Sequence, residues 1–487
     1  MRHLAHRLMD IARGRGIEFA DVRMRRSAGT AVFVQDGRVE QTSSGTSTTA
    51  GIRALADGAW GFACVESLDL NALQDALDAA THAAREIAAG ATRKVEVARP
   101  GVIDRENDDV ISFQPRAASL ELKAARLVKL EQDGIDAVKP GAIVNSAISY
   151  ADGEATEVVA NTFGTVVSQH HARATCACTM VARDGDSTES WTEKIGLPNS
   201  TDLLSNLEPD EFSVKAAREA LAQTRAAPAP GGVMPVIFDP SITGLLVHEC
   251  LGHSAEADLV LRGHSILDGR IGDRIASELV TIVDDPTLAL AWGGYRYDSE
   301  GVPAERVTLI EAGVLVSWLE SLETASRTGR APNGHGRSEG ALARPIPRMS
   351  NTFLASGEHD IDEMIRGVER GVLVAHGESG YAMSERGQYS CSANRGWRIE
   401  HGALGEPVRH VSVSGDILET LSTIDRVSSD FQLCDPGYCG KDGQEVPVDN
   451  GGPYVRVQGI LVGGVMDGRI APQELSRRRA SGRRVVL

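Results

Sequence analysis

Hydrophobic residues interspersed with polar ones run through residues 20–66, in segments such as TAVFVQDGRVEQT, and this pattern indicates β-strands. Asp-Gly dipeptides at 36–37 and 57–58 interrupt the strands, and this dipeptide is typical of tight hairpin turns. Apolar residues then recur at helical spacing over 70–87, and Gly90 ends that pattern. The sequence therefore predicts a meander of hairpins followed by a helix.

Amphipathic patterns predict two further helices, at residues 1–16 and at 117–134. After the second of these, residues 143–185 again indicate strands joined by tight turns. The order helix, meander, helix thus occurs twice, although no strict sequence period supports an internal repeat.

A domain boundary is indicated at residues 225–232, where Pro, Ala and Gly are concentrated between a helical stretch and the apolar strand 233–238. The second half is rich in short segments punctuated by glycine, a pattern typical of an antiparallel β domain with long functional loops. We therefore predict an α+β protein of two domains. Residues 1–226 would hold helices with antiparallel β-meanders, and 233–487 a β-rich domain carrying the metal-site helix.

Composition adds limits on partners and location. The chain has 487 residues, 42% of them hydrophobic, and a net charge of -17, so nucleic acid and anionic membranes are not expected as partners. No run approaches the length of a membrane span, and the N-terminus lacks the features of a signal peptide, so the cytoplasm is the expected location. The basic segment 476–484 is interpreted as a solvated tail, and the seven scattered cysteines do not suggest a disulfide framework.

The segment HECLGH resembles a zinc-protease motif with one additional residue, because His248 and His253 stand at i and i+5 rather than i and i+4. On a regular helix these two side chains would point about 140° apart. A shared metal therefore requires the helix to bend, widen or end, and Gly252 is the residue best able to permit this. The spacing alone leaves a chance occurrence open.

A third ligand would decide the question, since catalytic zinc takes three protein ligands. Cys439 and Cys434 both qualify, in a loop where Lys441 would favour a thiolate. Cys250 points away from His248 on a helix and is expected to be packed. A second metal site on the predicted strand at 170–178 is less expected than a buried face; its four residues would be His170, His171, Cys176 and Cys178.

Four ordered motifs carry a resemblance to a known family: HECLGH, GRIGDRIASELVTIVDDPT, RPIPRMSNTFLASG and YCGKDGQEVPV. Together with the N-terminal meander, they resemble the TldD/PmbA family of modulators of gyrase, and specifically its metal-bearing TldD-type subunit. The resemblance implies a zinc metallopeptidase in which His248, His253 and Cys439 bind Zn²⁺ and Glu249 is the catalytic base. It also implies a PmbA/TldE-like partner subunit in a heterodimer, although a homodimer is possible.

Other polar residues near these motifs have open roles. Glu256 and Asp258 can fix the tautomer of a ligating imidazole or can be exposed carboxylates near a helix end. Arg348 and Asn351 can hold substrate backbone or brace their loop. Three further histidines are more typical of satisfied loop or core positions than of ligands; they are His264, His335 and His376.

The leading functional hypothesis is a zinc endopeptidase or amidase that acts on unfolded or small peptides, including peptide precursors. The β-rich second half suggests that a peptide can bind as an additional strand. One alternative is a tailoring amide hydrolase of a secondary-metabolite pathway. Another is a regulatory subunit without catalysis, which the complete set of His248, Glu249, His253 and Cys439 disfavours.

Overall fold

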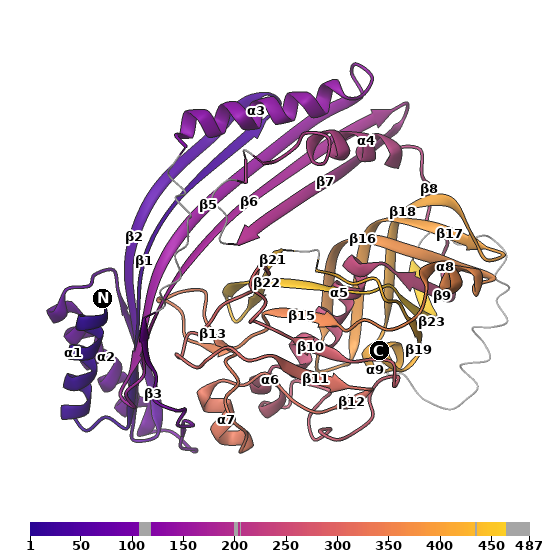
Figure 1. Cartoon of the computed structure of the whole chain (residues 1–487). Coiled ribbons are helices and arrows are strands. Elements are labelled where there is room, and N and C mark those ends of the chain that lie inside the picture. Colours follow the sequence, from indigo (N-terminus) through magenta and orange to yellow (C-terminus); the bar gives the residue numbers. More distant parts are fainter. Residues whose placement is uncertain (107–117, 199–202, 205, 434–435, 464–487) are drawn as a thin grey trace.

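The computed structural model describes residues 1–106, 118–198, 203–204, 206–433 and 436–463. Cys434 and the basic segment 476–484 lie outside the described residues. The protein is α+β, as predicted, and a long curved sheet from the N-terminal half arches over a β-rich C-terminal half (Figure 1). Within the described residues, no helix is long and apolar enough to cross a membrane.

The arched sheet has the strand order β3-β2-β1-β5-β6-β4, with β7 added on β6. Its strands are β1 Phe19–Gln35, β2 Arg38–Ala56, β3 Ala59–Val65, β4 Asp104–Glu106, β5 Ile143–Asn161, β6 Val166–Asp184 and β7 Ser187–Pro198. Both predicted Asp-Gly turns are confirmed, because all four residues at 36–37 and 57–58 have positive φ. Antiparallel pairing of β1 with β5 joins the two predicted meanders into one sheet.

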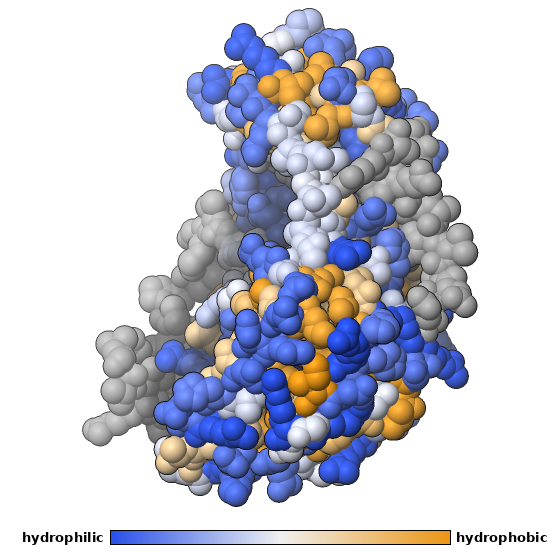
Figure 2. Space-filling view, turned by 90° about the vertical axis from the view of Figure 1, so that its left-hand side faces the viewer, coloured by the Kyte–Doolittle hydropathy of each residue, from blue (hydrophilic) through white to orange (hydrophobic). Residues whose placement is uncertain are grey.

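The strands at 143–185 are longer and have fewer turns than their sequence suggests. Asp152 and Gly153 form a potential turn, yet β5 runs straight through them because β1 and β6 pair with it on both sides. In β2, by contrast, residues 38–47 are exposed on both faces. This Ser-, Thr- and Gly-rich part of β2 forms a pale stripe, neither strongly polar nor strongly apolar, along the edge of the arch (Figure 2).

Four helices cover the arched sheet. Helices α1 Arg2–Gly14 and α2 Leu70–Ala88 bury their apolar sides at one end of it, and Asp69 caps the first amides of α2. Helices α3 Leu120–Asp136 and α4 Ser213–Gln223 lie on its outer face (Figure 1), where α3 packs against β1 and β5 and α4 packs against β6 and β7. The inner, concave face is thereby left toward the C-terminal half.

The C-terminal half contains a barrel and a second sheet. Pairing of β18 with β23 closes the barrel through β9, β16 and β17, with β8 and β19 at its margins. The barrel strands are β8 Ala227–Pro228, β9 Gly232–Phe238, β16 Arg370–Met383, β17 Gln388–Glu400, β18 Ala403–Asp416, β19 Ile424–Val427 and β23 Val455–Gly463. The helices beside it are α8 Ile361–Arg366 and α9 Ile417–Ser422.

The second sheet has the order β12-β11-β10-β15-β22-β20, with β21 added on β22. Its strands are β10 Ile282–Asp284, β11 Val307–Glu311, β12 Val314–Leu315, β15 Asn351–Leu354, β20 Gln432–Leu433, β21 Gly437–Lys441 and β22 Gln444–Gly452. A small hairpin pairs β13 Gly336–Arg337 with β14 Ile346–Pro347, and α7 Leu322–Thr328 lies between this hairpin and β12 in the chain.

The C-terminal half is β-rich and mainly antiparallel, as the sequence pattern indicates, but β9 pairs parallel with β16 and β15 pairs parallel with β22. Parallel pairs require long crossover connections, and the chain builds much of the second sheet between β9 and β16. Helix α5 Pro240–Val247 begins this crossover and packs against both β16 and β22. It is thus fixed between the barrel and the second sheet (Figure 1).

Candidate metal centre

The helix that carries the HECLGH motif starts as the sequence predicts. Asp239 caps it, its side chain accepting a hydrogen bond of 2.9 Å from the Ile242 N–H, and Pro240 occupies the first turn. The helix interior is apolar on almost every side, and Ile242, Leu246 and Val247 are buried in the main core. The motif therefore follows a rigid, well-anchored segment.

Helical geometry then changes at the motif itself. Residues His248–Gly252 form a π-helical turn, followed by a 3-10 turn over His253–Ala255 and the short helix α6 Ala257–Leu261. A π turn holds one more residue than an α turn, so it absorbs the additional residue of the motif. The predicted departure from regular geometry is confirmed.

Gly252 contributes to this turn in a different way from the one predicted. Its backbone is ordinary right-handed helix, with φ -53° and ψ -54°, which any residue can adopt. A Cβ atom at this position would instead overlap with the sulfur of Met349. Glycine is favoured here because the buried Met349 side chain approaches its backbone closely, and the backbone dihedral angles do not require it.

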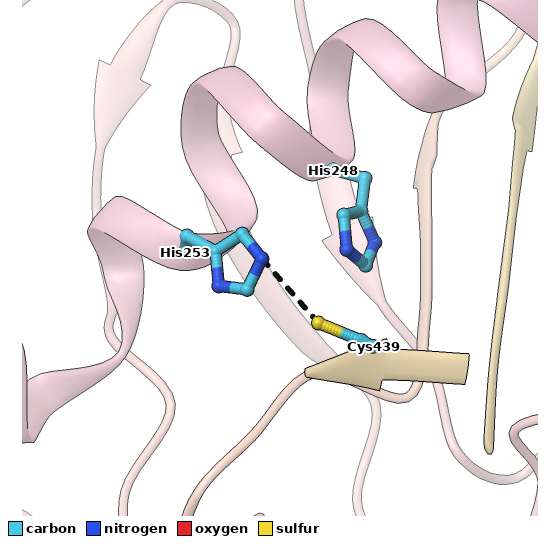
Figure 3. Close-up of side chains that lie close together, drawn as sticks. All are labelled: His248, His253 and Cys439. Carbon is cyan, nitrogen blue, oxygen red and sulfur yellow. Dashed lines mark hydrogen bonds between the residues drawn. The ribbon is translucent and has the colours of Figure 1, made fainter. Parts of the chain in front are cut away.

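Two histidines and one cysteine converge below the π turn (Figure 3). One ligand atom from each of His248, His253 and Cys439 lies within 4.8 Å of the others. Cys439 arrives on β21, and its Sγ lies 3.3 Å from His253 Nε2. The two imidazole rings are 5.1 Å apart and nearly perpendicular. Among the described residues, this is the one group of His, Cys, Asp and Glu side chains compact enough to hold a metal.

The charges of the three side chains depend on one another. Burial opposes the thiolate of Cys439, but the charges and hydrogen bonds of His248 and His253 outweigh it and lower the pKa of Cys439 to about 4. Burial likewise opposes protonation of the two imidazoles, yet the Cys439 thiolate raises the pKa of both. The groups that lower the pKa of Cys439 most are the two histidines, while Lys441, which the sequence suggested for this role, is paired with two carboxylates.

Glu256 is the residue that connects the metal helix to the loop of Cys439. It is fully buried, and its Oε2 lies 3.3 Å from His253 Nδ1 and 3.1 Å from Lys441 Nζ. Its Oε1 lies 3.4 Å from Arg348 Nε. Despite burial, these cationic partners lower the pKa of Glu256 to about 2. One carboxylate therefore orients a candidate ligand and offsets two buried cations.

The other open residues of these motifs have bracing roles. Asp258 does not contact an imidazole; it lies 2.7 Å from Lys441 Nζ. Arg348 is fully buried and donates to the backbone carbonyl of Cys439, which excludes direct contact with a peptide in this conformation. Asn351 is also buried, and it accepts from the Gly293 N–H and donates to the Asp285 carbonyl. Both residues hold loops around the centre.

Glu249 follows His248 directly and lies on the side of the helix that faces β16. A Cβ atom on Gly380 of that strand would stand 2.6 Å from Glu249 Cγ, so the strand approaches the carboxylate side chain closely. Unlike Glu256, Glu249 is only partly buried. Its carboxylate is close enough to His248 for its charge to favour the protonated form of that imidazole and raise its pKa.

The remaining sequence candidates lie away from the centre. Cys250 is packed in the main core, as predicted, and Cys176 and Cys178 are buried under α3 and α4, where burial raises the pKa of all three thiols. Four of the other candidate histidines lie apart from the His248, His253 and Cys439 group. His170 and His171 lie on β6 near Glu154 and Glu157, His264 is exposed, and His376 stacks on Trp191 at 4.0 Å.

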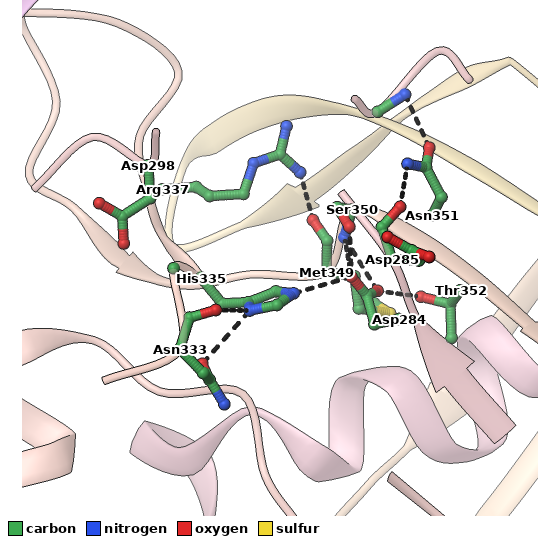
Figure 4. Close-up of polar contacts among 12 residues, drawn as sticks. Asp284, Asp285, Asp298, Asn333, His335, Arg337, Met349, Ser350, Asn351 and Thr352 are labelled. Carbon is green, nitrogen blue, oxygen red and sulfur yellow. Dashed lines mark hydrogen bonds and ion pairs between the residues drawn. The ribbon is translucent and has the colours of Figure 1, made fainter. Parts of the chain in front are cut away.

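Sequence reasoning missed a buried polar network behind the centre (Figure 4). Asp284 accepts hydrogen bonds from His335 Nε2 at 2.9 Å, from the backbone and hydroxyl of Ser350, and from the Thr352 hydroxyl at 2.6 Å. This network holds the loop that contains Met349, whose side chain lies directly against the backbone of Gly252. The acidic pair in VDDP, directly after an apolar strand, was the one local signal that could have indicated it.

The donor set fits a metal ion. One thiolate and two imidazoles are a recognised set for zinc, which takes three protein ligands in catalytic sites. In addition, His248 Nδ1 is buried without a hydrogen-bond partner among the described residues. A buried polar atom left in this way is costly unless something binds there. Both the chemistry and the unpartnered nitrogen therefore agree with a metal site.

Two histidines on a helix held between a barrel and a sheet, with Cys439 opposite them on β21 and Glu249 beside His248, form a donor set of the kind that zinc metalloenzymes use. Three family models match the chain: PmbA/TldA metallopeptidase domain 1 at residues 20–88, the central domain at 113–224 and the C-terminal domain at 231–464. The chain belongs to the PmbA/TldD metallopeptidase family.

Individual relatives agree with this membership. A metalloprotease of Methanothermobacter thermautotrophicus is 36% identical over 463 residues, covering 95% of this chain and 98% of that protein. A zinc metalloprotease TldD homolog of Saccharolobus solfataricus is 25% identical over 92% of this chain and 97% of its own length. The crystal structure of TldE from Thermococcus kodakarensis has the same fold, with a TM-score of 0.76, 20% identity and coverage of 95% of this chain and 100% of that one.

Proposed function

We propose that this protein is a zinc-dependent peptidase in which His248, His253 and Cys439 hold the metal and Glu249 is the general base. The observation that carries the proposal is the π turn, which brings two histidines spaced at i and i+5 onto one side of the helix, opposite Cys439. The donor set supports zinc, since thiolate and imidazole together suit this ion.

A zinc ion held there would polarise the carbonyl of the scissile amide and make water more acidic. Glu249 accepts the proton of the attacking water and passes it to the departing amine. Glu256 accepts a hydrogen bond from His253 Nδ1, so the Nε2 lone pair faces Cys439 and the metal position. Arg348 and Lys441 in turn keep Glu256 ionised.

We propose unfolded or small peptides, including peptide precursors, as substrates. A backbone can be bound as an additional strand without reference to its side chains, and β21, which carries Cys439, pairs with β22 and with no other strand of the described residues. A PmbA/TldE-like subunit is the proposed partner, supported by the shared fold with TldE, and a second copy of this chain is the alternative. The cytoplasmic location stays a prediction from the sequence.

The test combines metal analysis with hydrolysis of a fluorogenic unfolded peptide. We expect about one zinc per chain, and we expect Glu249→Gln to retain the zinc while losing at least 100-fold in kcat. Glu385→Gln, an exposed carboxylate removed in the same way, should leave both unchanged. Activity that survives in Glu249→Gln would refute the base. Absence of both zinc and hydrolysis, with and without a partner subunit, would favour a regulatory role.

A further inference from the structure

A cleft separates the concave face of the arched sheet from the C-terminal half. It consists of two adjoining cavities of about 470 and 330 Å³. Both are lined by Arg25 of β1, by His171 and Arg173 of β6, and by Tyr438 of β21. In the larger cavity most of the other lining residues are small, so an extended peptide can lie along it, whereas the smaller cavity is lined mainly by large polar and aromatic residues.

Arg173 is the central cation of this cleft. Along β6, Ala172 and Ala174 point into the core under α3 and α4, so Arg173 points to the concave side. Its Nε donates to the backbone carbonyl of Trp292 at 3.3 Å, and its guanidinium lies 5.6 Å from the centre of that indole ring. Among the described residues, no carboxylate lies within 4.0 Å of Arg173. The contacts with Trp292 therefore position the guanidinium group of Arg173, but no adjacent carboxylate neutralises its charge.

Other cations surround Arg173. Arg337 donates to the backbone carbonyls of Met349 and Pro447, neither of which carries a charge. Arg25 has a buried Nε without a hydrogen-bond partner in the described part of the chain. Burial, together with the charges of Arg337 and Arg25, lowers the pKa of Arg173 to about 10. The three guanidinium groups thus repel one another in a partly desolvated space.

The nearby carboxylates do not offset this charge. Glu157 is already shared between Arg25 at 3.5 Å and His171 at 3.6 Å. Burial and neighbouring Glu300 raise the pKa of Asp298 well above its usual range, which disfavours the charged form of that side chain. Glu339 and Glu445 line the other wall but are exposed, so water screens them. Asp152 and Glu154 also line the larger cavity but lie against Lys123 and His170, so among the described residues no unshared carboxylate is close to Arg173.

We propose that Arg173, with Arg25 beside it, binds a carboxylate of the peptide substrate in this cleft. A planar guanidinium fork suits a carboxylate, and a small, partly desolvated site strengthens the pair. The inference rests on the proposed peptidase function and adds a recognition element to it. The carboxylate is either the C-terminus of the peptide or an acidic side chain, and the two sources share the same chemistry.

The cleft is connected to the metal centre through β21. Neighbouring residues of a strand point to opposite faces, so Tyr438 faces the cleft while Cys439 faces the two histidines. Trp292 links the two sides, because its carbonyl accepts from Arg173 and its indole N–H donates to the Gly437 carbonyl at 2.9 Å. A peptide anchored at Arg173 would have to pass the edge of β21 to reach the metal centre.

The test uses three versions of one short unfolded peptide: with a free C-terminal carboxylate, with a C-terminal amide, and with an amide after a terminal Glu. Binding to the hydrolysis-deficient Glu249→Gln protein is measured by calorimetry, and hydrolysis by the otherwise unaltered protein is measured separately. We expect the free acid to bind about tenfold more tightly than the amide. If the amidated Glu peptide binds as tightly as the free acid, an acidic side chain is an equally good source of the carboxylate.

Arg173→Gln should remove the preference for the acid, and Arg173→Lys should retain part of it, since the charge remains without the fork. The matched control is Arg183→Gln, which removes an exposed arginine of the same strand and face and should keep the full preference. Thermal unfolding of each variant reports whether it is folded. If Arg173→Gln does not fold, the binding preference of Arg173→Lys still tests the proposal.

The outcomes separate the two proposals. Suppose that the protein with Arg173 intact hydrolyses the free-acid peptide and the amide peptide and binds them equally well. The carboxylate site is then wrong and the peptidase proposal stands. If no peptide is hydrolysed, but the acid still binds more tightly and Arg173→Gln removes this, the site stands and the peptidase proposal fails. A preference that is unchanged in Arg173→Gln and Arg173→Lys would also overturn the assignment.

Discussion

The side chain of Met349 lies directly against the backbone of Gly252, where a Cβ atom would overlap with its sulfur. Gly252 is the last residue of the π turn, and it immediately precedes His253. Met349 itself belongs to a loop that Asp284 fixes through Ser350. The position of one candidate ligand is therefore set by a contact with a loop nearly a hundred residues away in the chain.

Gly252→Ala tests this contact. Either Met349 or the helix must move, so we expect a loss of about 1–3 kcal/mol in the free energy of unfolding. Zinc affinity should fall by at least tenfold, because His253 moves with the turn. Chemical denaturation and competition with a metal chelator measure the two effects. Gly440→Ala is the control, since a Cβ there meets open space beside Cys439; equal effects in both variants would contradict the steric argument.

Glu256→Gln removes the charge that holds His253, Lys441 and Arg348 together. Two buried cations would lose their closest shared anion, so we expect a loss of about 3–5 kcal/mol in unfolding free energy. The amide also offers His253 a weaker acceptor, and zinc affinity should fall by about 10- to 100-fold. Glu278→Gln, an exposed change of the same kind, should alter neither. Zinc affinity like that of the unaltered protein would show that Glu256 does not orient the imidazole.

Local patterns predicted the parts of the fold that local forces determine. The Asp-Gly turns at 36–37 and 57–58 adopt positive φ as expected, and Asp239 and Pro240 begin the helix as expected. The additional residue between His248 and His253 also predicted a departure from α-helical geometry, because 3.6 residues per turn cannot place both on one side.

Contacts between residues far apart in the chain leave no comparable pattern in the sequence from which they could be predicted. Asp152 and Gly153 remain in a strand because two neighbouring strands satisfy their backbone groups, which overrides the local turn preference. The sequence suggested that Lys441 would favour a thiolate, but in the structure its Nζ forms ion pairs with Glu256 and Asp258, which follow the HECLGH motif. The roles of Asp284 and Met349 likewise depend on partners that no sequence spacing identifies.

The protonation of the centre makes metal binding depend on pH. The pKa of Cys439 is about 4, so this side chain is already a thiolate near neutral pH. The thiolate raises the pKa of His248 and His253, so these imidazoles hold their protons to higher pH and a metal must compete with those protons. Zinc affinity should therefore fall as the pH falls from about 7.5 to about 5.5, with proton release from histidine.

Calorimetry in two buffers of different ionisation enthalpy measures the number of protons released. In metal-free Cys439→Ala, the main cause of the raised histidine pKa values is gone while burial remains, so both pKa values should drop. NMR of labelled imidazoles reports this directly. Zinc binding that is independent of pH over this range would contradict the thiolate–imidazolium description.

Asp284→Asn tests the network behind the centre (Figure 4). His335 Nε2 lies 2.9 Å from Asp284 Oδ1 and Nδ1 lies 2.9 Å from the Asn333 carbonyl oxygen, so the carboxylate holds one side of this buried ring. Removing the carboxylate should cost about 3–5 kcal/mol of unfolding free energy at neutral pH.

Burial opposes ionisation of Asp284, but His335 and the hydroxyl donors lower the pKa of Asp284 below its usual 3.8. A depressed carboxyl pKa stabilises the fold above the unfolded-state value, and this contribution is lost as the pH falls through the folded-state value. The unaltered protein should therefore lose stability on acidification more steeply than Asp284→Asn, as denaturation at several pH values would show. Exposed Asp273→Asn should follow the unaltered protein, and parallel acid profiles for Asp284→Asn would exclude this pair as the source.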